Sequence, residues 1–198
     1  MKALLVVDVQ NDFCPGGALA VPEGDQVVPF TNAIRGDYTV VVFSQDWHPP
    51  GHKSFANSNP GTQVGQVIEL HGQPQVMWPD HCVQDTPGAA FHKDLLRRPD
   101  DRVFRKGELI EVDSYSAFMD NDHHHETGLN DYLKAQGVTS LDVVGLATDY
   151  CVRYSVLDAR KFGYEVVVLR SGCRAVNLEP GDGEKALAEM EAAGAILR

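Results

Sequence analysis

The chain has 198 residues, 43% of them hydrophobic, and a formal net charge of -11 at pH 7. A single domain of this length buries a substantial core, so we expect one domain over residues 1–198. Its acidic balance repels phosphate backbones and anionic lipid, which argues against nucleic acids and membranes as partners.

The first eight residues carry one lysine and a short apolar stretch, with no small-residue cleavage site, so they predict a first strand rather than a signal peptide. No apolar run is long enough to span a bilayer. A chain of this size does not need disulfides to fold, and together these features predict a cytoplasmic protein with free thiols. The four cysteines are Cys14, Cys82, Cys151 and Cys173.

Short runs rich in valine, leucine and isoleucine predict strands at 3–7, 40–43, 102–104, 141–146, 165–169 and 193–197. Several are apolar throughout, which is typical of strands covered on both faces of a parallel sheet. Helical spacing and composition predict helices at 127–136, 151–162 and 183–193. The order predicts an α/β fold, a three-layer α/β/α sandwich around a mostly parallel, Rossmann-like sheet of about six strands.

Two stretches interrupt this pattern. Residues 13–25 form a loop rich in glycine and proline, and residues 48–85 are long and weakly periodic. Long segments without regular structure in a compact domain are usually functional or mobile, so residues from both stretches are candidates for a site.

Polar side chains follow four of the predicted strands, where each strand ends. They are Asp8, Asp46 with His48, Lys106, and Cys151. In open parallel sheets, ligands bind beyond the carboxyl ends of the strands, so these side chains are expected at one rim. Their joint placement indicates an enzyme.

Cys151 opens a predicted helix directly after a strand, and the positive end of a helix dipole favours the nucleophilic thiolate. Asp8 follows five apolar residues and could take the thiol proton, while Lys106 could hold both groups in place. The structural alternatives are a buried hydrophobic cysteine and a buried Asp8–Lys106 salt bridge.

Asp46 and His48 offer a carboxylate oxygen and an imidazole nitrogen, and His81 could add a second imidazole from the long loop. Two histidines and a carboxylate suit zinc, iron or manganese. Three further residues of the loop compete as ligands, namely His52, His71 and Asp80.

The run His123–His125 lies among Asn and Asp residues and predicts a solvated turn before a helix rather than a metal site. Cys82 is a rival nucleophile, but it lacks a strand-to-helix setting. Cys14 and Cys173 are expected to be structural.

Three aromatic residues lie near the predicted rim and could wall a flat pocket for a small molecule. They are Phe13, Trp78 and Tyr115. Each could equally be packed in the core.

Taken together, these residues resemble the nicotinamidase/pyrazinamidase family, within the isochorismatase-like cysteine hydrolases. The resemblance covers nearly the whole chain, and its segments occur in the family's order: Val6–Phe13, Ser44–His48, Trp78–Gln84, Lys106–Gly107, Asp113–Phe118 and Gly145–Val152. The Asp46-x-His48 pair with Trp78–His81 is the more specific part, because relatives without a metal lack it.

The resemblance implies Asp8, Lys106 and Cys151 as a catalytic triad. It implies one divalent metal per chain, zinc first, bound by Asp46, His48 and His81. Ser54 stands where family members carry either histidine or serine, so it is a further candidate ligand, direct or through water.

The resemblance also implies a cis peptide before Ala147, with the N–H groups of Ala147 and Cys151 as an oxyanion hole. Substrate would lie with its ring between Phe13, Trp78 and Tyr115 and its ring nitrogen toward the metal.

The activity expected from this resemblance is hydrolysis of nicotinamide to nicotinate and ammonia through a cysteine thioester, in NAD salvage, with deamidation of pyrazinamide as a further reaction. The nearest alternative is a metal-free relative acting on an isochorismate, ureido or carbamoyl substrate. A binding protein that kept the scaffold is the alternative from another class. The sequence leaves open whether copies of the chain form a homo-oligomer.

Overall fold

The computed structural model describes residues 1–198, and its centre is a six-stranded sheet in the order β5-β2-β1-β6-β7-β8. All neighbouring strands in this sheet run parallel. The strands are β1 (Lys2–Val7), β2 (Val40–Asp46), β5 (Arg102–Lys106), β6 (Ser140–Leu146), β7 (Glu165–Arg174) and β8 (Ile196–Leu197). The predicted α/β architecture is therefore confirmed.

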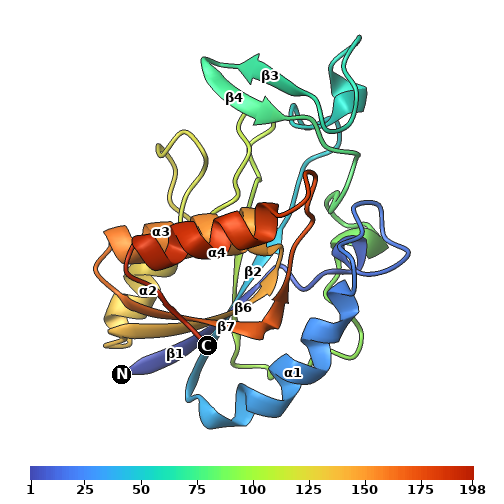
Figure 1. Cartoon of the computed structure of the whole chain (residues 1–198). Coiled ribbons are helices and arrows are strands. Elements are labelled where there is room, and N and C mark those ends of the chain that lie inside the picture. Colours follow the sequence, from blue (N-terminus) through green and yellow to red (C-terminus); the bar gives the residue numbers. More distant parts are fainter.

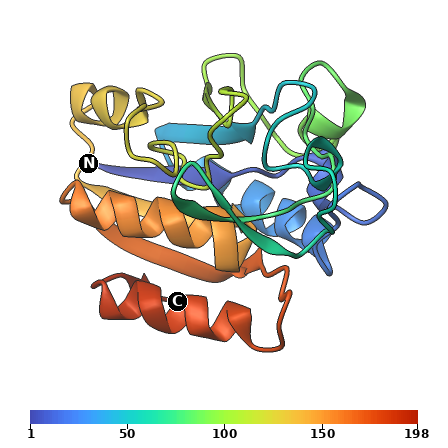
Figure 2. The same ribbon diagram turned by 90° about the horizontal axis from the view of Figure 1, so that it is seen from above.

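Helices cover both faces of the sheet (Figures 1 and 2). They are α1 (Val27–Ile34), α2 (Leu129–Ala135), α3 (Arg153–Lys161) and α4 (Asp182–Ala192). Successive side chains of a strand point to opposite faces, so β1 contributes to two cores. Ala3, Leu5 and Val7 pack with residues of α2, α3 and α4, whereas Leu4 and Val6 pack with residues of α1.

Most predicted elements are present, with shifted boundaries. The predicted helix 151–162 begins later as an α-helix, at Arg153, because a π-helical turn (Thr148–Val152) precedes it. The last strand is shorter than predicted, because a turn at 193–195 separates it from the end of α4 at Ala192.

One helix and one hairpin were not predicted. Helix α1 carries Pro29 in its first turn, where proline is tolerated. The long loop contains an antiparallel hairpin, β3 (Val67–Leu70) and β4 (Gln73–Val76), which Figure 1 shows standing off one end of the sheet domain. Short 3-10 turns occur at Asn11–Phe13, Gly24–Gln26, Arg35–Asp37, Ala56–Ser58 and Pro87–Ala89.

Gly145 lets β6 lie against β1 near the rim. Its φ is +127°, and a Cβ built there would lie 2.1 Å from the Val7 carbonyl oxygen. A side chain would therefore push apart the two strands whose ends carry Asp8 and the Thr148–Val152 turn.

None of the helices is long and apolar enough to cross a bilayer.

Candidate active site and metal centre

The sheet order brings the predicted rim residues together. Strands β5, β2, β1 and β6 are consecutive neighbours, so their carboxyl ends meet. Asp8 directly follows β1, Asp46 and Lys106 end β2 and β5, and Cys151 lies in the turn after β6. All four side chains are buried.

The Lys106 ammonium is the centre of this cluster. Its Nζ lies 3.0 Å from Asp8 Oδ2, 2.8 Å from Asp46 Oδ1 and 3.4 Å from the Cys151 sulfur. It also donates to the Ser114 carbonyl oxygen at 2.8 Å. Burial opposes the charge, but the two carboxylates outweigh it and raise the pKa of Lys106 well above its usual value. Lys106 therefore stays a cation and joins the thiol to both carboxylates.

The two oxygens of Asp8 have different neighbours. Oδ1 accepts a hydrogen bond from Ser44 Oγ at 2.6 Å, whereas Oδ2 faces the Lys106 ammonium at 3.0 Å and accepts from no other side chain. Complete burial raises the pKa of Asp8 above its usual value of 3.8, although Lys106 works in the opposite direction. A buried carboxylate with a raised pKa and a free lone pair is suited to accept a proton from a neighbour.

Burial also raises the pKa of the Cys151 thiol well above 9, and Lys106 only partly offsets this effect. The expectation that a helix start at Cys151 favours the thiolate is therefore not supported. Burial is the largest influence on this pKa and raises it, and Cys151 lies inside the π-helical turn rather than at the start of α3. The sulfur needs a base to become a nucleophile.

The peptide bond between Leu146 and Ala147 is cis, as predicted. The Ala147 carbonyl oxygen accepts hydrogen bonds from the N–H groups of Tyr150 and Val152 at 3.1 Å each, whereas the Ala147 N–H makes no backbone hydrogen bond. A free N–H therefore lies in the same turn as Cys151.

Three donors suited to a metal converge beside this cluster. The Nε2 atoms of His48 and His81 lie 3.1 and 3.4 Å from Asp46 Oδ2. The Nδ1 atoms of these histidines face the carbonyl oxygens of Gly107 and Pro79, at 3.0 and 2.8 Å. Donation of Nδ1–H to a carbonyl leaves the Nε2 lone pair for a metal, which is the usual arrangement around ligating histidines. These residues fit zinc.

Asp46 is held from two sides. Gln10 brackets its backbone, with Oε1 accepting from the Asp46 N–H and Nε2 donating to the Asp46 carbonyl oxygen, both at 2.8 Å. Burial opposes ionisation of the side chain, but His48 and Lys106 together hold the pKa of Asp46 well below 3.8. Asp46 is therefore an anion, with Oδ1 toward Lys106 and Oδ2 toward the histidines.

The competing ligands are less well placed. His52 and Asp113 form a second group with His48, yet His52 Nδ1 lies 2.7 Å from Ser54 Oγ and its Nε2 lies 3.3 Å from the Val112 carbonyl oxygen. Ser54 is buried, and its hydroxyl faces His52. His71 pairs with Glu111 on the surface, 3.1 Å away.

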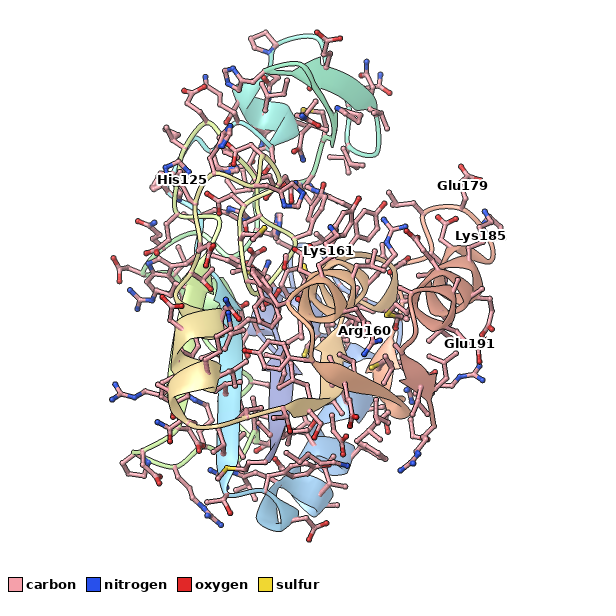
Figure 3. The ribbon with its side chains drawn as sticks, turned by 90° about the vertical axis from the view of Figure 1, so that its left-hand side faces the viewer. His125, Arg160, Lys161, Glu179, Lys185 and Glu191 are labelled. Carbon is pink, nitrogen blue, oxygen red and sulfur yellow. The ribbon has the colours of Figure 1, made fainter.

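Asp80 accepts from Asn57 instead. The run His123–His125 is exposed, as predicted, in the loop before α2. His125 nevertheless forms a group with Asp120 and Asp122, and Figure 3 places it at the periphery of the molecule.

A pocket opens beside Cys151, and its walls are mainly apolar. It contains all three predicted aromatic residues, together with Asp46 and His81 from the metal centre. Its other lining residues are Leu19, Asp113, Ala147, Tyr150 and Val176. The rings of Trp78 and Tyr150 meet edge to face at 4.8 Å, and Tyr150 lies 5.5 Å from Tyr115. A flat ring could lie between these walls with its substituent over the sulfur.

Several residues of the site were missed from the sequence. Ser44, one residue after the predicted second strand, was a detectable neighbour of the rim. Asp149 fixes the wall at Val176 by accepting the N–H groups of Val176 and Asn177 at 2.9 and 2.7 Å. These two hydrogen bonds span 27 and 28 positions of the chain, so no local sequence pattern indicates them.

Comparison with known proteins places the chain among hydrolases. Residues 2–198 match the model of the isochorismatase domain. The nicotinamidase of Escherichia coli K12 is 50% identical over 202 residues, covering 99% of this chain and 93% of that protein.

Solved structures give the same result. A nicotinamidase/pyrazinamidase of Acinetobacter baumannii superposes with a TM-score of 0.95 and 45% identity, covering 99% of this chain and 94% of that one. A pyrazinamidase of Pyrococcus horikoshii in complex with zinc superposes with a TM-score of 0.82 and 35% identity, covering 100% and 98%.

Proposed function

The chain belongs to the isochorismatase family, and we propose that it is a nicotinamidase, which hydrolyses nicotinamide to nicotinate and ammonia. The observation that carries the proposal is the position of the Cys151 sulfur. It lies 3.4 Å from an ammonium that also contacts Asp8, and it lines a pocket with flat aromatic walls and two members of a metal centre. Full-length similarity to nicotinamidases supports it.

The first step is removal of the thiol proton. Asp8 Oδ2 and the Cys151 sulfur both lie beside Lys106 Nζ, at 3.0 and 3.4 Å, so the carboxylate stands next to the thiol. Asp8 takes the proton, and Lys106 stabilises the thiolate while it attacks the amide carbon. Asp8 then returns the proton to the leaving ammonia, so one carboxyl group serves as base and then as acid. The resulting thioester is hydrolysed by water with Asp8 again as the base.

The tetrahedral intermediates carry a negative oxygen. We assign its stabilisation to the N–H groups of Ala147 and Cys151 in the turn after β6, which the free Ala147 N–H supports. One such donor contributes about 10²- to 10³-fold to the rate in other enzymes.

Asp46, His48 and His81 would hold a divalent metal, and zinc is favoured by the donor set and by the zinc complex of the Pyrococcus relative. When bound, it supplies a Lewis acid that anchors the ring nitrogen of the substrate. Phe13, Trp78 and Tyr115 hold the ring itself by stacking and exclusion of water. Ser54 is the weakest candidate for a further ligand, because its hydroxyl faces His52.

Pyrazinamide is a second substrate, because it presents the same carboxamide on a ring of the same shape. Relatives named for both activities support this extension. Nicotinate is the product that NAD salvage uses, which gives the reaction its place in metabolism.

The direct test is release of ammonia from nicotinamide by purified protein, with and without added zinc. The wild-type protein should turn over nicotinamide, and Cys151→Ala should lose about 10⁴-fold or more of the rate while keeping its fold. Turnover by Cys151→Ala at a tenth of the wild-type rate would refute the role of the sulfur.

A metal-free relative that acts on isochorismate or carbamoyl compounds is the rival. Stoichiometric zinc in the purified protein, lost together with nicotinamide binding on chelation, separates the two. Full nicotinamide kinetics after complete chelation would contradict the ring-anchoring role of the metal.

A further inference from the structure

The β3–β4 hairpin reaches the active site through one side chain. Between residues 61 and 76, Gln75 is the only buried residue, with 5% of its surface exposed. Hollows of about 220 and 230 Å³ both have Gln75 in their walls, so the hairpin is not packed continuously against the rest of the protein. The other polar contact of the hairpin is the exposed His71–Glu111 pair, and exposed ion pairs contribute little to stability.

The side-chain amide of Gln75 ends among polar groups of the pocket wall. Its Nε2 lies 2.9 Å from Asp113 Oδ2, 3.1 Å from the Tyr115 hydroxyl and 2.8 Å from the Val76 carbonyl oxygen. Asp113 is a fixed anchor, because its Oδ1 accepts the Ser114 N–H at 2.8 Å.

The side-chain amide of Gln75 also contacts Tyr115. The Tyr115 hydroxyl receives N–H groups from two sides, from Gln75 and from Trp78 Nε1, each at 3.1 Å. Its ring lies 5.5 Å from the ring of Tyr150 and 6.5 Å from that of Trp78, and all three line the pocket that contains Cys151. Hydrogen bonds from two sides hold the hydroxyl end of the Tyr115 ring in place, and this ring is part of the pocket wall.

We infer that Gln75 is a positioning residue, which ties the β3–β4 hairpin to Asp113 and thereby holds Tyr115 and the aromatic wall at the width of one flat ring. The inference rests on the proposed function, because it assigns the selection of small ring amides to this wall. Gln75 touches neither the sulfur nor the three metal donors, so it acts on binding and selectivity and not on the chemical step.

The test compares Gln75→Leu with Gln73→Leu, an exposed position on the same strand. In Gln75→Leu, KM for nicotinamide should rise about tenfold, as expected when a buried polar contact is lost, with kcat within about twofold of wild type. The ratio of kcat/KM for a ring-methylated nicotinamide to that for nicotinamide should increase. Gln73→Leu should match wild type in all three quantities.

Tyr115→Phe tests whether the effect passes through the hydroxyl. In that background, Gln75→Leu should change KM much less than it does in the wild-type protein. An equal change in both backgrounds, an unchanged KM in Gln75→Leu, or the same change in Gln73→Leu would overturn the inference. Zinc content is measured for each variant, and loss of zinc in Gln75→Leu would also overturn it.

A second readout does not need turnover. Alkylation of Cys151 by N-ethylmaleimide, relative to the smaller iodoacetamide, should accelerate in Gln75→Leu and not in Gln73→Leu. If the wild-type protein releases no ammonia, the proposed function fails, and this ratio still decides the role of Gln75. An unchanged ratio in Gln75→Leu would overturn that role.

Discussion

Two clusters of histidine and aspartate in this chain share residue types but differ in how their histidines are buried and held. Asp46, His48 and His81 are buried and come from β2, the residues just after it and the long loop. Asp120, Asp122 and His125 come from one loop, and the side chain of His125 is 61% exposed. In the first cluster, backbone carbonyls hold both Nδ1 atoms, whereas His125 Nδ1 lies 3.7 Å from Asp120.

The two clusters show that side chains of the right type are not enough to form a metal site. Burial and a second set of hydrogen bonds orient the donors and remove the competition of water. The buried cluster also shares Asp46 with Lys106, and through Lys106 it contacts Asp8 and Cys151. The exposed cluster has no such link.

Loss of the base should be the most damaging change at the buried cluster. Asp8→Asn keeps the shape of the side chain and removes its ability to accept the thiol proton, so kcat for nicotinamide should fall about 10³-fold. Steady-state ammonia release measures it, with circular dichroism as the check on folding. Asp122→Asn in the exposed cluster is the matched control and should leave kcat unchanged. A loss of less than tenfold in Asp8→Asn would remove Asp8 from the mechanism.

Metal affinity should separate the two clusters. His81→Ala removes one of three donors and should weaken zinc binding at the tight site by about 100-fold or more. His125→Ala should leave that affinity unchanged. Competition with a chromophoric chelator measures both. Weakening in His125→Ala alone would place the ion in the loop, and unchanged affinity in both variants would place it in neither cluster.

The acid limb of the pH profile should report Asp8. Burial raises the pKa of Asp8, and its deprotonated form is the base, so kcat/KM should fall as the pH drops through a value above 3.8. The Ser44 hydrogen bond lowers this pKa, so Ser44→Ala should move the acid limb to higher pH while leaving the plateau nearly unchanged. A limb that moves to lower pH would show that another group titrates.

The smallest effect is expected in the exposed loop. Replacing His123, His124 and His125 together with alanine should change the free energy of unfolding by about 0.5 kcal/mol or less, because these side chains are exposed. Urea denaturation measures it. A loss of several kcal/mol would mean that the loop has a structural role that its exposure does not suggest.

The sheet and its rim could be predicted from the sequence, because apolar runs mark the strands and Asp8, Asp46 and Lys106 lie at the ends of these runs. The hairpin was not predicted, because β4 is polar, with Gln73, Pro74 and Gln75 in place of β-branched residues, and β3 is only four residues long. Helix α1 was missed for a similar reason, since Pro29 and the preceding glycine-rich loop obscure its pattern.

The contacts that set the pKa of Cys151 and hold the pocket wall could not be predicted from the sequence either. The net pKa of Cys151 depends on burial by the assembled rim, and a local helix argument predicted the opposite direction. Gln75 meets Asp113 and Tyr115 across 38 and 40 residues of chain. Such tertiary contacts leave no local pattern in the sequence.

The most direct test of the central claim is to trap the thioester. The protein is mixed with nicotinamide, quenched in acid within the first turnover and digested, and the peptides are weighed by mass spectrometry. A nicotinoyl group should be found on the peptide that contains Cys151, and on none that contains Cys14, Cys82 or Cys173. Steady release of ammonia with the group on another cysteine, or undiminished release by Cys151→Ala, would contradict the account.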